Sequence, residues 1–479
     1  LDDVPRAGTV ELEVATDQAF RKVVARRAVR TSPDVGGSVK ASVRGLRAHE
    51  EYFYRFATKT TDSPVGRFRT AAPAGSSEPV RFAFFSCQDY THGYYNALEH
   101  MADQDLDFVV CLGDYIYDEA YHTVAGGTGV RDDTIGRFLP DYELKVAVSL
   151  EEYREKYSLY RSDPALRAVH ANFPMVVIWD DHEVQDNYAG KAPGGGLDPV
   201  LGFSRKRQRT GFKAWRENMP TFADPIYRRL TFGDTVDLIM LDQRRYRADQ
   251  PCDDAVAPPC EGWDQPRDFL GRRQMGWAKD ALASSKATWK VIGNEVMAMP
   301  AKVLGGSFYA FDSWQGYPRE REELLTHIRD RRIDDVVFVT GDIHTFIAGD
   351  VRTAMGEGDP AALEFVGGSI SSIGLGESNL DVGGGNVIAG NDQNPNTPQA
   401  LIDALREINP WVDQADFDHH GYGLVRADAS SFDCQLVRME TVKRKTTKTL
   451  PAAGFRWTVE RGQRSIKGVN GPPAAAPPA

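Results

Sequence analysis

The sequence predicts a layered α/β fold of the α+β kind, with a small all-β module in front of a larger mixed domain. Three observations support this prediction. Residues 1–72 contain segments in which apolar and polar residues alternate, which is the period of a half-buried strand. Residues 80–465 contain short, almost continuously apolar runs, typical of strands that are buried on both faces. Between those runs lie stretches with apolar residues at helical spacing.

The composition is that of an ordinary globular protein, since the 479 residues are 41% hydrophobic and 26% charged. The apolar runs are too short to cross a bilayer, so we expect no transmembrane segment. The net charge of −11 argues against a nucleic-acid partner that is bound by phosphate neutralisation. It does not argue against small phosphate substrates, because a metal site supplies its own local positive charge.

The N-terminal module is expected to be a small Ig- or fibronectin-like β-sandwich. Residues 9–14 and 51–56 show the alternation of strands. Residues 46–55 resemble the tyrosine-corner region of fibronectin-type sandwiches. Residues 73–79 belong to a stretch rich in Ala, Pro, Gly and Ser, and we interpret them as a linker.

The larger domain is expected over residues 80–465, followed by a disordered tail rich in Pro and Ala over residues 466–479. Its strand-like runs lie at 80–85, 108–112, 175–179, 236–241, 289–292 and 336–339, with further strands near 362–366 and 421–437. Its helical patterns lie at 94–104, 150–157, 204–218, 268–284 and 319–331.

Polar clusters follow the first six of these strands. They are Ser86-Cys87-Gln88, Gly113-Asp114 with Tyr117 and Asp118 beyond it, Asp180-Asp181-His182-Glu183, Asp242-Gln243-Arg244-Arg245, Gly293-Asn294-Glu295 and Gly341-Asp342-Ile343-His344. Ligands bind outside the carboxyl ends of strands in layered α/β folds, so we expect the clusters to converge. A Gly-Asp pair after a strand is by itself an ordinary turn. The set, rather than any one member, indicates a site.

Metal ions explain this set best. The four ionisable residues 180–183 leave one buried strand and would repel one another without cations. Carboxylate and amide oxygens suit calcium. Thiolate, phenolate and imidazole groups suit a transition metal. Glycines at 113, 293 and 341 indicate tight turns that bring backbone and ligands close together.

Four ordered motifs resemble those of the PhoD family of secreted alkaline phosphatases and phosphodiesterases, within the calcineurin-like metallophosphoesterases. They are Phe85-Ser-Cys-Gln88, Leu112-Gly-Asp-Tyr-Ile-Tyr-Asp118, Trp179-Asp-Asp-His-Glu183 and Thr340-Gly-Asp-Ile-His344. The resemblance covers nearly the whole chain and implies a four-layer β-sandwich flanked by helices, with two metal positions at the strand ends. It also implies secretion by the twin-arginine route. The chain begins at Leu1, which a removed export signal or a trimmed chain would each explain.

The resemblance further implies roles for single residues. Cys87, Tyr117 and His344 would bind Fe3+, and Asp114 would bridge the two metal positions. Asp181, Asn294 and Asp342 would bind Ca2+. Asp118 would be an additional ligand or a solvated turn residue.

Two-metal chemistry implies that a metal-bound hydroxide attacks phosphorus in line. His182 is the candidate general acid or orienting group. The alternative is a structural histidine that is hydrogen-bonded to a neighbouring carboxylate. Arg244 and Arg245 are candidates for clamping a phosphate oxygen, or they form an ion-paired surface.

The predicted function is phosphoester hydrolysis by an exported, monomeric enzyme that favours diesters over monoesters. The alternative is the iron-dependent phospholipase D branch of the family, which releases phospholipid headgroups. That alternative needs an apolar access surface for transient membrane contact, and the aromatic residues Phe308, Tyr309, Phe311, Trp314 and Tyr317 would provide it. The same residues are equally consistent with a loop packed over the core.

A hypothesis of another class is that the N-terminal module binds a surface polymer and that the metal domain is only structural. Structural metal sites are closed, whereas catalytic ones keep an open position. The sequence offers more hydrophilic ligands than one closed site needs.

The cysteines indicate an exported protein. Cys252 and Cys260 flank a Pro-rich loop and predict a disulfide, with two free thiols as the alternative. Cys111 and Cys434 lie in strand-like runs and are expected to be small core residues.

Overall fold

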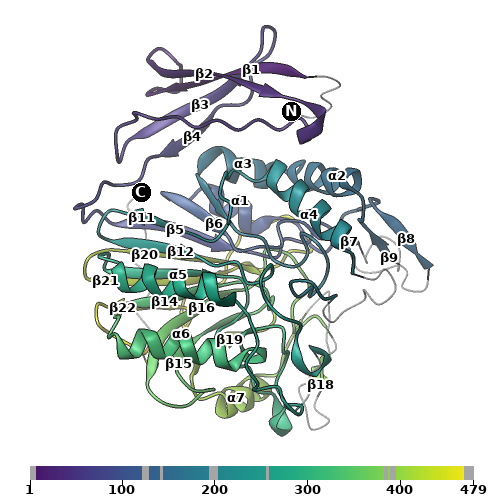
Figure 1. Ribbon diagram of the computed structural model, residues 1–479, viewed down its shortest axis with the longest axis vertical. Coiled ribbons are helices and arrows are strands. Elements are labelled where there is room, and N and C mark those ends of the chain that lie inside the picture. The colour runs from purple at the N-terminus through teal and green to yellow at the C-terminus, as the bar shows by residue number, and fades with distance from the viewer. Residues whose placement is uncertain are drawn as a thin grey trace.

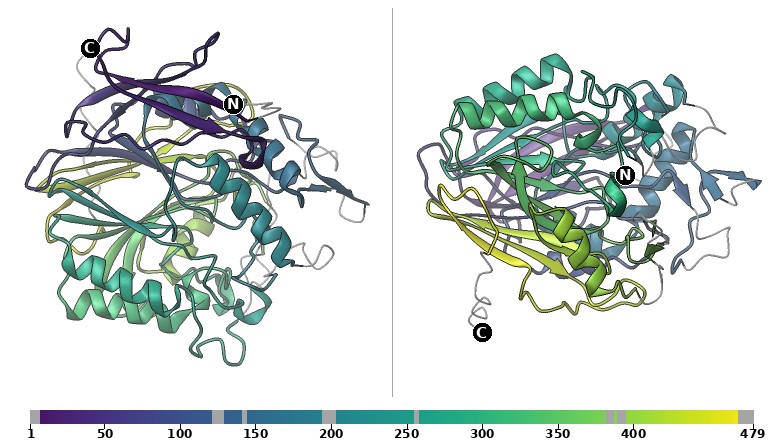
Figure 2. Two further views of the ribbon diagram at one scale, coloured as in Figure 1. Left: turned by 45° about the horizontal axis from the view of Figure 1, so that its top comes forward. Right: turned by 90° about the horizontal axis from the view of Figure 1, so that it is seen from below.

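The computed structural model describes residues 7–120, 129–140, 144–193, 203–254, 258–378, 380–381, 387–388 and 395–468. Two large sheets are stacked face to face, and helices cover the outer face of each (Figures 1 and 2). These four layers are the predicted β-sandwich flanked by helices. A small sheet formed by the N-terminal strands lies above them (Figure 1).

The first large sheet has six strands in the order β10-β6-β5-β20-β21-β22. Their bounds are β5 (Val80–Phe85), β6 (Phe108–Cys111), β10 (Met175–Val177), β20 (Gly421–Ala427), β21 (Ser431–Arg438) and β22 (Arg456–Glu460). Strands β10, β6 and β5 are parallel, so their carboxyl ends meet at one edge. The first three predicted ligand clusters begin at that edge.

The second large sheet has seven strands in the order β11-β12-β13-β14-β16-β15-β19. Their bounds are β11 (Arg228–Phe232), β12 (Val236–Met240), β13 (Trp289–Asn294), β14 (Val336–Thr340), β15 (Phe346–Arg352), β16 (Pro360–Gly367) and β19 (Val412–Asp416). Strands β12, β13, β14 and β16 are parallel. The remaining predicted clusters follow β12, β13 and β14.

Helices form the two outer layers. The helices between the six-stranded sheet and the N-terminal sheet are α1 (Asn96–Ala102), α2 (Leu150–Arg161), α3 (Pro164–Asn172) and α4 (Arg205–Asn218) (Figure 1). Helices α5 (Gly271–Ser284) and α6 (Pro318–Asp330) pack on the outer face of the seven-stranded sheet, and α7 (Gln399–Ile408) contacts β19. Buried side chains such as Phe84 and Phe365 fill the space between the sheets. A second core lies between the seven-stranded sheet and α5 and α6.

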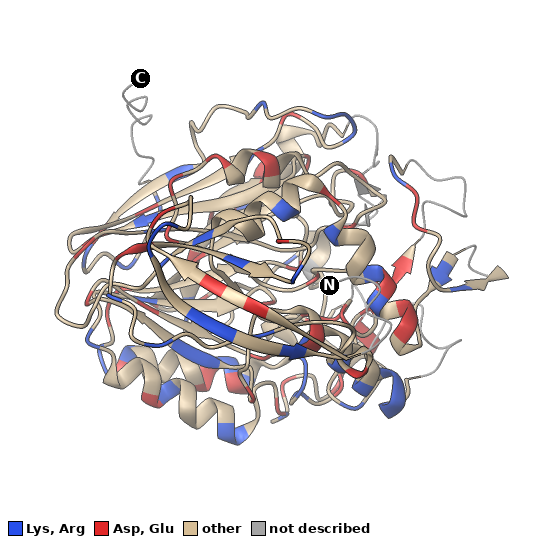
Figure 3. Cartoon of the chain, turned by 90° about the horizontal axis from the view of Figure 1, so that it is seen from above, with Lys and Arg blue, Asp and Glu red and all other residues tan. Residues whose placement is uncertain are grey.

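The N-terminal strands form one antiparallel sheet in the order β2-β1-β3-β4. They are β1 (Gly8–Ala15), β2 (Val23–Thr31), β3 (Glu51–Ala57) and β4 (Gly66–Arg69). The Arg47 backbone N–H donates to the Tyr52 hydroxyl over 2.9 Å, a contact of the tyrosine-corner type. In the described part of this region there is a single sheet, so the all-β prediction is confirmed but the second sheet of a sandwich is not seen. Strand β1 carries acidic residues and the neighbouring strand β2 carries basic ones (Figure 3).

Smaller elements connect the layers. They are the three-stranded sheet β7 (Glu119–Ala120), β9 (Leu144–Val146) and β8 (Arg137–Leu139), the hairpin β17 (Leu380–Asp381) and β18 (Val387–Ile388), and 3-10 turns at Pro33–Val35, Pro251–Asp254, Leu304–Gly306 and Trp314–Gly316. At the C-terminal end, Ile466 is buried and its N–H donates to Asp350. Residues 469–479, most of the predicted tail, lie outside the described residues.

The predicted disulfide between Cys252 and Cys260 is confirmed. Cys111 and Cys434 are buried and have no disulfide partner, as expected of core residues. Among the described residues, no helix is long and apolar enough to cross a membrane.

Candidate metal centre

The predicted ligands come from four strand ends. Cys87 follows β5, Asp114 and Tyr117 follow β6, Asp181 follows β10, and Asp342 and His344 follow β14. Two glycines permit the close approach of these loops. A side chain at position 341 would collide with Ser86, and one at position 113 would collide with Asp180.

The first group of ligands contains Cys87, Asp114, Tyr117 and His344. Ligand atoms of Cys87, Asp114 and His344 all lie within 4.8 Å of one another. The Tyr117 hydroxyl lies 3.0 Å from Asp114 Oδ2 and 2.9 Å from His344 Nε2. All four residues predicted for the iron position, counting the bridging aspartate, therefore meet at one point.

The pKa values of the residues in this group are consistent with a bound cation. Burial raises the pKa of both Cys87 and Tyr117 well above their usual values, and the Asp114 carboxylate raises both further. Without a metal both groups stay protonated, whereas a bound cation stabilises the thiolate and phenolate. Burial lowers the pKa of His344 to about 4, so the ring is neutral at pH 7. Its Nδ1 faces the Ile373 carbonyl at 2.8 Å and must carry the proton, which leaves the Nε2 lone pair free for a ligand bond.

The backbone at these positions is unusual. Cys87, Asp114, Asp342 and His344 have φ angles of 58°, 51°, 67° and 56°, in the left-handed region that non-glycine residues rarely adopt. Such conformations are costly and persist where the surroundings enforce them, often at functional sites. Here they direct side chains from strand ends toward a common point.

A second group of oxygen donors adjoins the first. Ligand atoms of Asp114, Asp181 and His182 lie within 4.8 Å of one another, as do those of Asp180, Asp181 and Asp342. Asp181 Oδ1 is buried and accepts no hydrogen bond of good geometry from the described residues, and its nearest cationic group is the Arg244 guanidinium at 3.3 Å. An unsatisfied carboxylate oxygen inside a protein is costly, and a calcium ion would satisfy it.

A pocket of about 290 Å³ opens onto both groups. Its acidic and imidazole lining consists of Asp114, Asp181, His182, Asp186, Asp312, Asp342 and His344. The ligand residues Asp114, Asp181, Asp342 and His344 therefore face an open space rather than being fully enclosed, which is the arrangement of a catalytic site.

His182 lies at the wall of this pocket. Its ring stacks on Tyr117, with 4.1 Å between the centroids, and its Nδ1 is 2.9 Å from Asp118 Oδ1. Burial lowers the pKa of His182, but the carboxylates of Asp181 and Asp114 outweigh burial and raise it well above its usual value. Asp118 is thus the partner of His182 and of Arg207, 2.6 Å away, rather than a solvated turn residue.

Arg244 lies elsewhere than expected of a phosphate clamp. Its side chain is fully buried, and its guanidinium contacts the carboxylates of Asp180, Asp181, Asp312 and Asp342. These four carboxylates surround the guanidinium and balance its charge. Arg245 is partly exposed and pairs with Asp224 at 3.5 Å.

Asn294 does not join the oxygen donors. Strand β13 continues through Asn294, two residues beyond the predicted strand end, so the residue stays inside the sheet. Its Oδ1 accepts hydrogen bonds from Trp314, at 2.9 Å, and from Gln243. Its Nδ2 donates to Val296 and Thr340. This amide is fully engaged by the protein.

Of the two interpretations of the aromatic stretch, an access surface or a loop packed over the core, the structure shows the packed loop. Phe308, Phe311, Trp314 and Tyr317 are buried. Tyr309 alone is partly exposed, and it lines the pocket described above.

Several residues of the site were not predicted as ligands. Asp186 lies 3.9 Å from His182 Nε2, and its place four residues further along the same loop is a signal that could have found it. Asp312 comes from a distant loop and carries no local signal. Glu183 accepts the backbone N–H groups of Asp114, Tyr115 and Asp180, so it ties two strand-end loops together.

A buried cluster of two histidines and a glutamate is connected to the first ligand group through the loop that carries Ile373 and Gly374. Glu377 Oε2 lies 2.9 Å from His92 Nε2 and 3.1 Å from His420 Nε2, and it accepts the Gly374 N–H over 2.8 Å. Glu377 thereby anchors the loop that carries Ile373, whose carbonyl orients His344. Sequence reasoning missed this cluster, because its members lie far apart in the chain.

Comparison with known proteins agrees with this architecture. The family model described as PhoD-like phosphatase matches residues 82–436, and the model of the PhoD-like phosphatase N-terminal domain matches residues 2–72. The chain is 37% identical over 388 residues to alkaline phosphatase D of Bacillus subtilis (strain 168), which is 78% of this chain and 64% of that protein. The chain therefore spans less than two thirds of the length of this curated relative.

Two solved structures are similar. One described as the structure of PhoD has a TM-score of 0.82 and 31% identity, covering 96% of this chain and 86% of that one. A purple acid phosphatase from yellow lupin (Lupinus luteus) seeds has a TM-score of 0.56 and 13% identity, covering 99% and 74%, and shares the fold alone. From the extent of the family match and the ordered strand-end motifs, the chain belongs to the PhoD-like phosphatase family.

Proposed function

We propose that this chain is a metal-dependent phosphoesterase that hydrolyses phosphodiesters in preference to monoesters. The observation that carries the proposal is the convergence of Cys87, Asp114, Tyr117 and His344 beside a second group of carboxylates, with Asp114 and His344 lining an open pocket. When bound, cations at these positions activate water and neutralise charge on phosphoryl oxygens.

We further propose Fe3+ for the first group and Ca2+ for the second. Thiolate, phenolate and imidazole donors suit a transition metal. Asp181 and Asp342 offer only carboxylate oxygens, which suit calcium, and Asp114 lies between the groups. Asn294 is omitted from the calcium ligands, because both of its polar side-chain atoms are engaged in the sheet.

His182 is the proposed general acid for the leaving oxygen. Asp118 fixes the orientation of its ring, and the ring lines the pocket. Arg244 is proposed to balance the charge of the buried carboxylates rather than to contact phosphate.

The test is hydrolysis of bis-p-nitrophenyl phosphate and p-nitrophenyl phosphate by protein loaded with iron and calcium. We expect the diester to be hydrolysed faster, and Asp114→Asn to lower kcat by at least about 100-fold through loss of the bridging ligand. The partly exposed His419 provides a control, and His419→Asn should leave kcat unchanged. A wild-type protein that carries both metals and hydrolyses neither ester would contradict the proposal.

The general acid is tested by varying the leaving group. p-Nitrophenolate leaves without a proton, whereas an alkoxide needs one. His182→Asn should therefore slow hydrolysis of a methyl ester by about 100-fold or more, within the range of general acid catalysis, and that of a p-nitrophenyl ester by much less. An equal loss for both esters would assign His182 a positioning role.

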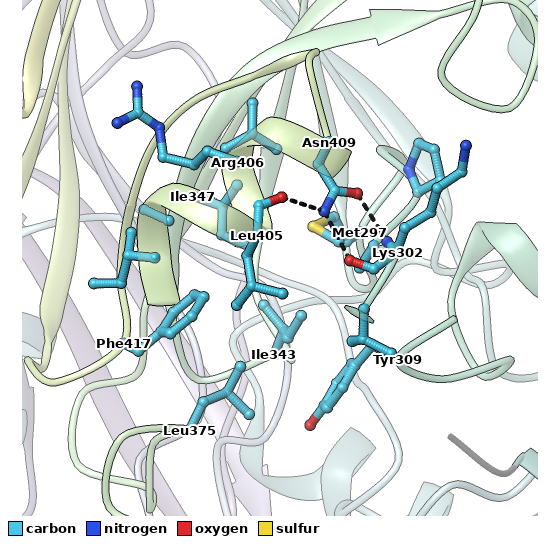
Figure 4. A pocket seen from close by; sticks show the side chains of 16 residues that line it. Met297, Lys302, Tyr309, Ile343, Ile347, Leu375, Leu405, Arg406, Asn409 and Phe417 are labelled. Carbon is cyan, nitrogen blue, oxygen red and sulfur yellow. Dashed lines mark hydrogen bonds between the residues drawn. The ribbon is translucent and has the colours of Figure 1, made fainter. Parts of the chain in front are cut away.

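Phospholipid headgroup release is the second candidate, favoured by an apolar cavity next to the pocket (Figure 4). Choline release from phosphatidylcholine vesicles in the presence of calcium would support it. Failure of release by a preparation that hydrolyses the chromogenic diester would remove this candidate. Hydrolysis retained after deletion of residues 1–72 would count against a function limited to polymer binding.

We also propose that the protein acts outside the cytoplasm. The support is the disulfide between Cys252 and Cys260, which persists in oxidising compartments. Fusion of the gene to its native upstream sequence, followed by fractionation with and without the twin-arginine translocase, tests the compartment and the route.

A further inference from the structure

An apolar cavity lies between α7, β19 and the loop around residues 297–309. It has a volume of about 60 Å³. Its apolar lining comprises Met297, Val303, Ile347, Ile402, Leu405, Ala415 and Phe417, together with residues of the neighbouring pocket. Figure 4 shows Leu405 and Phe417 directed toward Ile343 and Leu375 across the cavity.

The cavity adjoins the metal pocket. Tyr309, Ile343 and Leu375 line both spaces. Ile343 stands between Asp342 and His344 in the chain, so the apolar wall begins within one residue of two predicted ligands. The Tyr309 ring belongs to the wall, and burial, followed by the nearby carboxylate of Asp342, raises the pKa of its phenol.

The polar groups at the cavity are already engaged or point outward. The Asn409 amide donates to the carbonyls of Lys302 and Leu405 over 2.7 Å and accepts the Lys302 N–H over 2.8 Å. The charged ends of Lys302 and Arg406 point away from the cavity (Figure 4). A ligand group in this space therefore meets carbon atoms and gains from leaving water.

The size of the cavity limits its occupant. One water molecule needs about 10–15 Å³ measured in the same way, so a volume of about 60 Å³ accommodates about four to six heavy atoms. A branched alkyl or phenyl group has this size. An ester group that begins at a phosphate in the metal pocket would enter the cavity past Ile343, which lines both spaces.

We propose that this cavity binds an apolar ester group of the substrate, of the size of an isobutyl or phenyl group, while the phosphate lies at the metal centre. The proposal rests on the phosphoesterase function and specifies the substrate class for that site. Ala415 on β19 and Ala301 on the facing loop determine how much room is left, because a larger side chain at either position fills the space.

Calorimetry on the protein loaded with iron and calcium tests the proposal without requiring turnover. The ligands are methyl, isobutyl, phenyl and 2-hydroxyethyl phosphate, which share the phosphate and differ in the ester group. Burial of one methylene changes affinity about fourfold. We expect isobutyl phosphate to bind at least about tenfold more tightly than methyl phosphate, with no such gain for the hydroxyethyl ester. Comparison of isobutyl with phenyl phosphate distinguishes an alkyl from an aryl occupant.

Ala415→Leu should reduce the preference for isobutyl over methyl phosphate to about twofold and leave methyl phosphate binding unchanged. Ala301→Leu is the second filling variant, used if the first does not fold. Ala400→Leu adds the same side chain on the exposed face of α7 and should keep the wild-type preference. Equal affinity of the wild type for all four esters, or an equal loss of all four in both filling variants, would overturn the subsite. An isobutyl preference in a protein that hydrolyses no phosphoester would instead refute the proposed function and leave the subsite standing.

Discussion

The Tyr117 hydroxyl lies 2.9 Å from His344 Nε2, although 227 residues separate the two in the chain. Tyr117 follows β6 of the six-stranded sheet, and His344 follows β14 of the seven-stranded sheet. The first ligand group therefore joins the two halves of the sandwich. Metal bound there is expected to stabilise the packing of the sheets as well as to serve the chemistry.

Replacement of Arg244 by methionine should destabilise the protein. The guanidinium is the partner of buried carboxylates at Asp180, Asp312 and Asp342, and removal of one member of a buried ion pair costs about 3–5 kcal/mol. Urea denaturation measures the loss. Arg245→Met, at a partly exposed position, should cost less than about 1 kcal/mol. An Arg244→Met protein of normal stability but raised KM would restore the phosphate-clamp interpretation.

Metal removal should destabilise the protein more at pH 8 than at pH 5. Burial and neighbouring charges raise the pKa of Asp180, Glu183 and Asp186 to about 7. Between about pH 4 and 7 the folded protein without metal binds more protons than the unfolded chain, so its free energy of unfolding falls as the pH rises. Bound cations stabilise the ionised carboxylates, so the metal-loaded folded protein does not take up these extra protons. Thermal unfolding with and without chelator at both pH values measures the effect, and an equal drop in Tm at both would contradict it.

Replacement of Glu377 by glutamine should weaken iron binding indirectly, through the orientation of His344. Glu377 holds the loop whose Ile373 carbonyl orients His344. We expect a lower iron content and a shifted visible absorption band, with partial recovery in Glu377→Asp. Glu440→Gln, near His420 but outside the cluster, is the control. A Glu377→Gln protein with reduced stability but an unchanged spectrum would limit Glu377 to a structural role.

Much of the candidate site followed from the sequence, because its ligands stand directly after buried parallel strands. The apolar runs before Cys87, Asp114, Asp181 and Asp342 were recognisable as strands, and parallel strands bring such ends to one edge. Asn294 differs, since β13 runs two residues further than its apolar run and the amide is hydrogen-bonded to Trp314 and Val296.

What could not be predicted depends on contacts between distant segments. The partners of Arg244 include Asp312, which is 68 residues away on an irregular loop. The cluster of His92, Glu377 and His420 joins segments of the chain that are far apart, since His92 and His420 are 328 residues apart (420 minus 92). The aromatic residues around Phe311 suggested a surface by their density, yet a loop packed on the core has the same composition.

Elemental analysis combined with a visible spectrum tests most directly the proposed binding of a ferric ion by Cys87, Tyr117 and His344. Thiolate or phenolate bound to ferric iron gives a coloured protein. We expect about one iron per chain and a visible band that Tyr117→Phe bleaches or shifts while His419→Asn does not. A colourless, active protein that contains zinc and no iron would contradict the iron assignment.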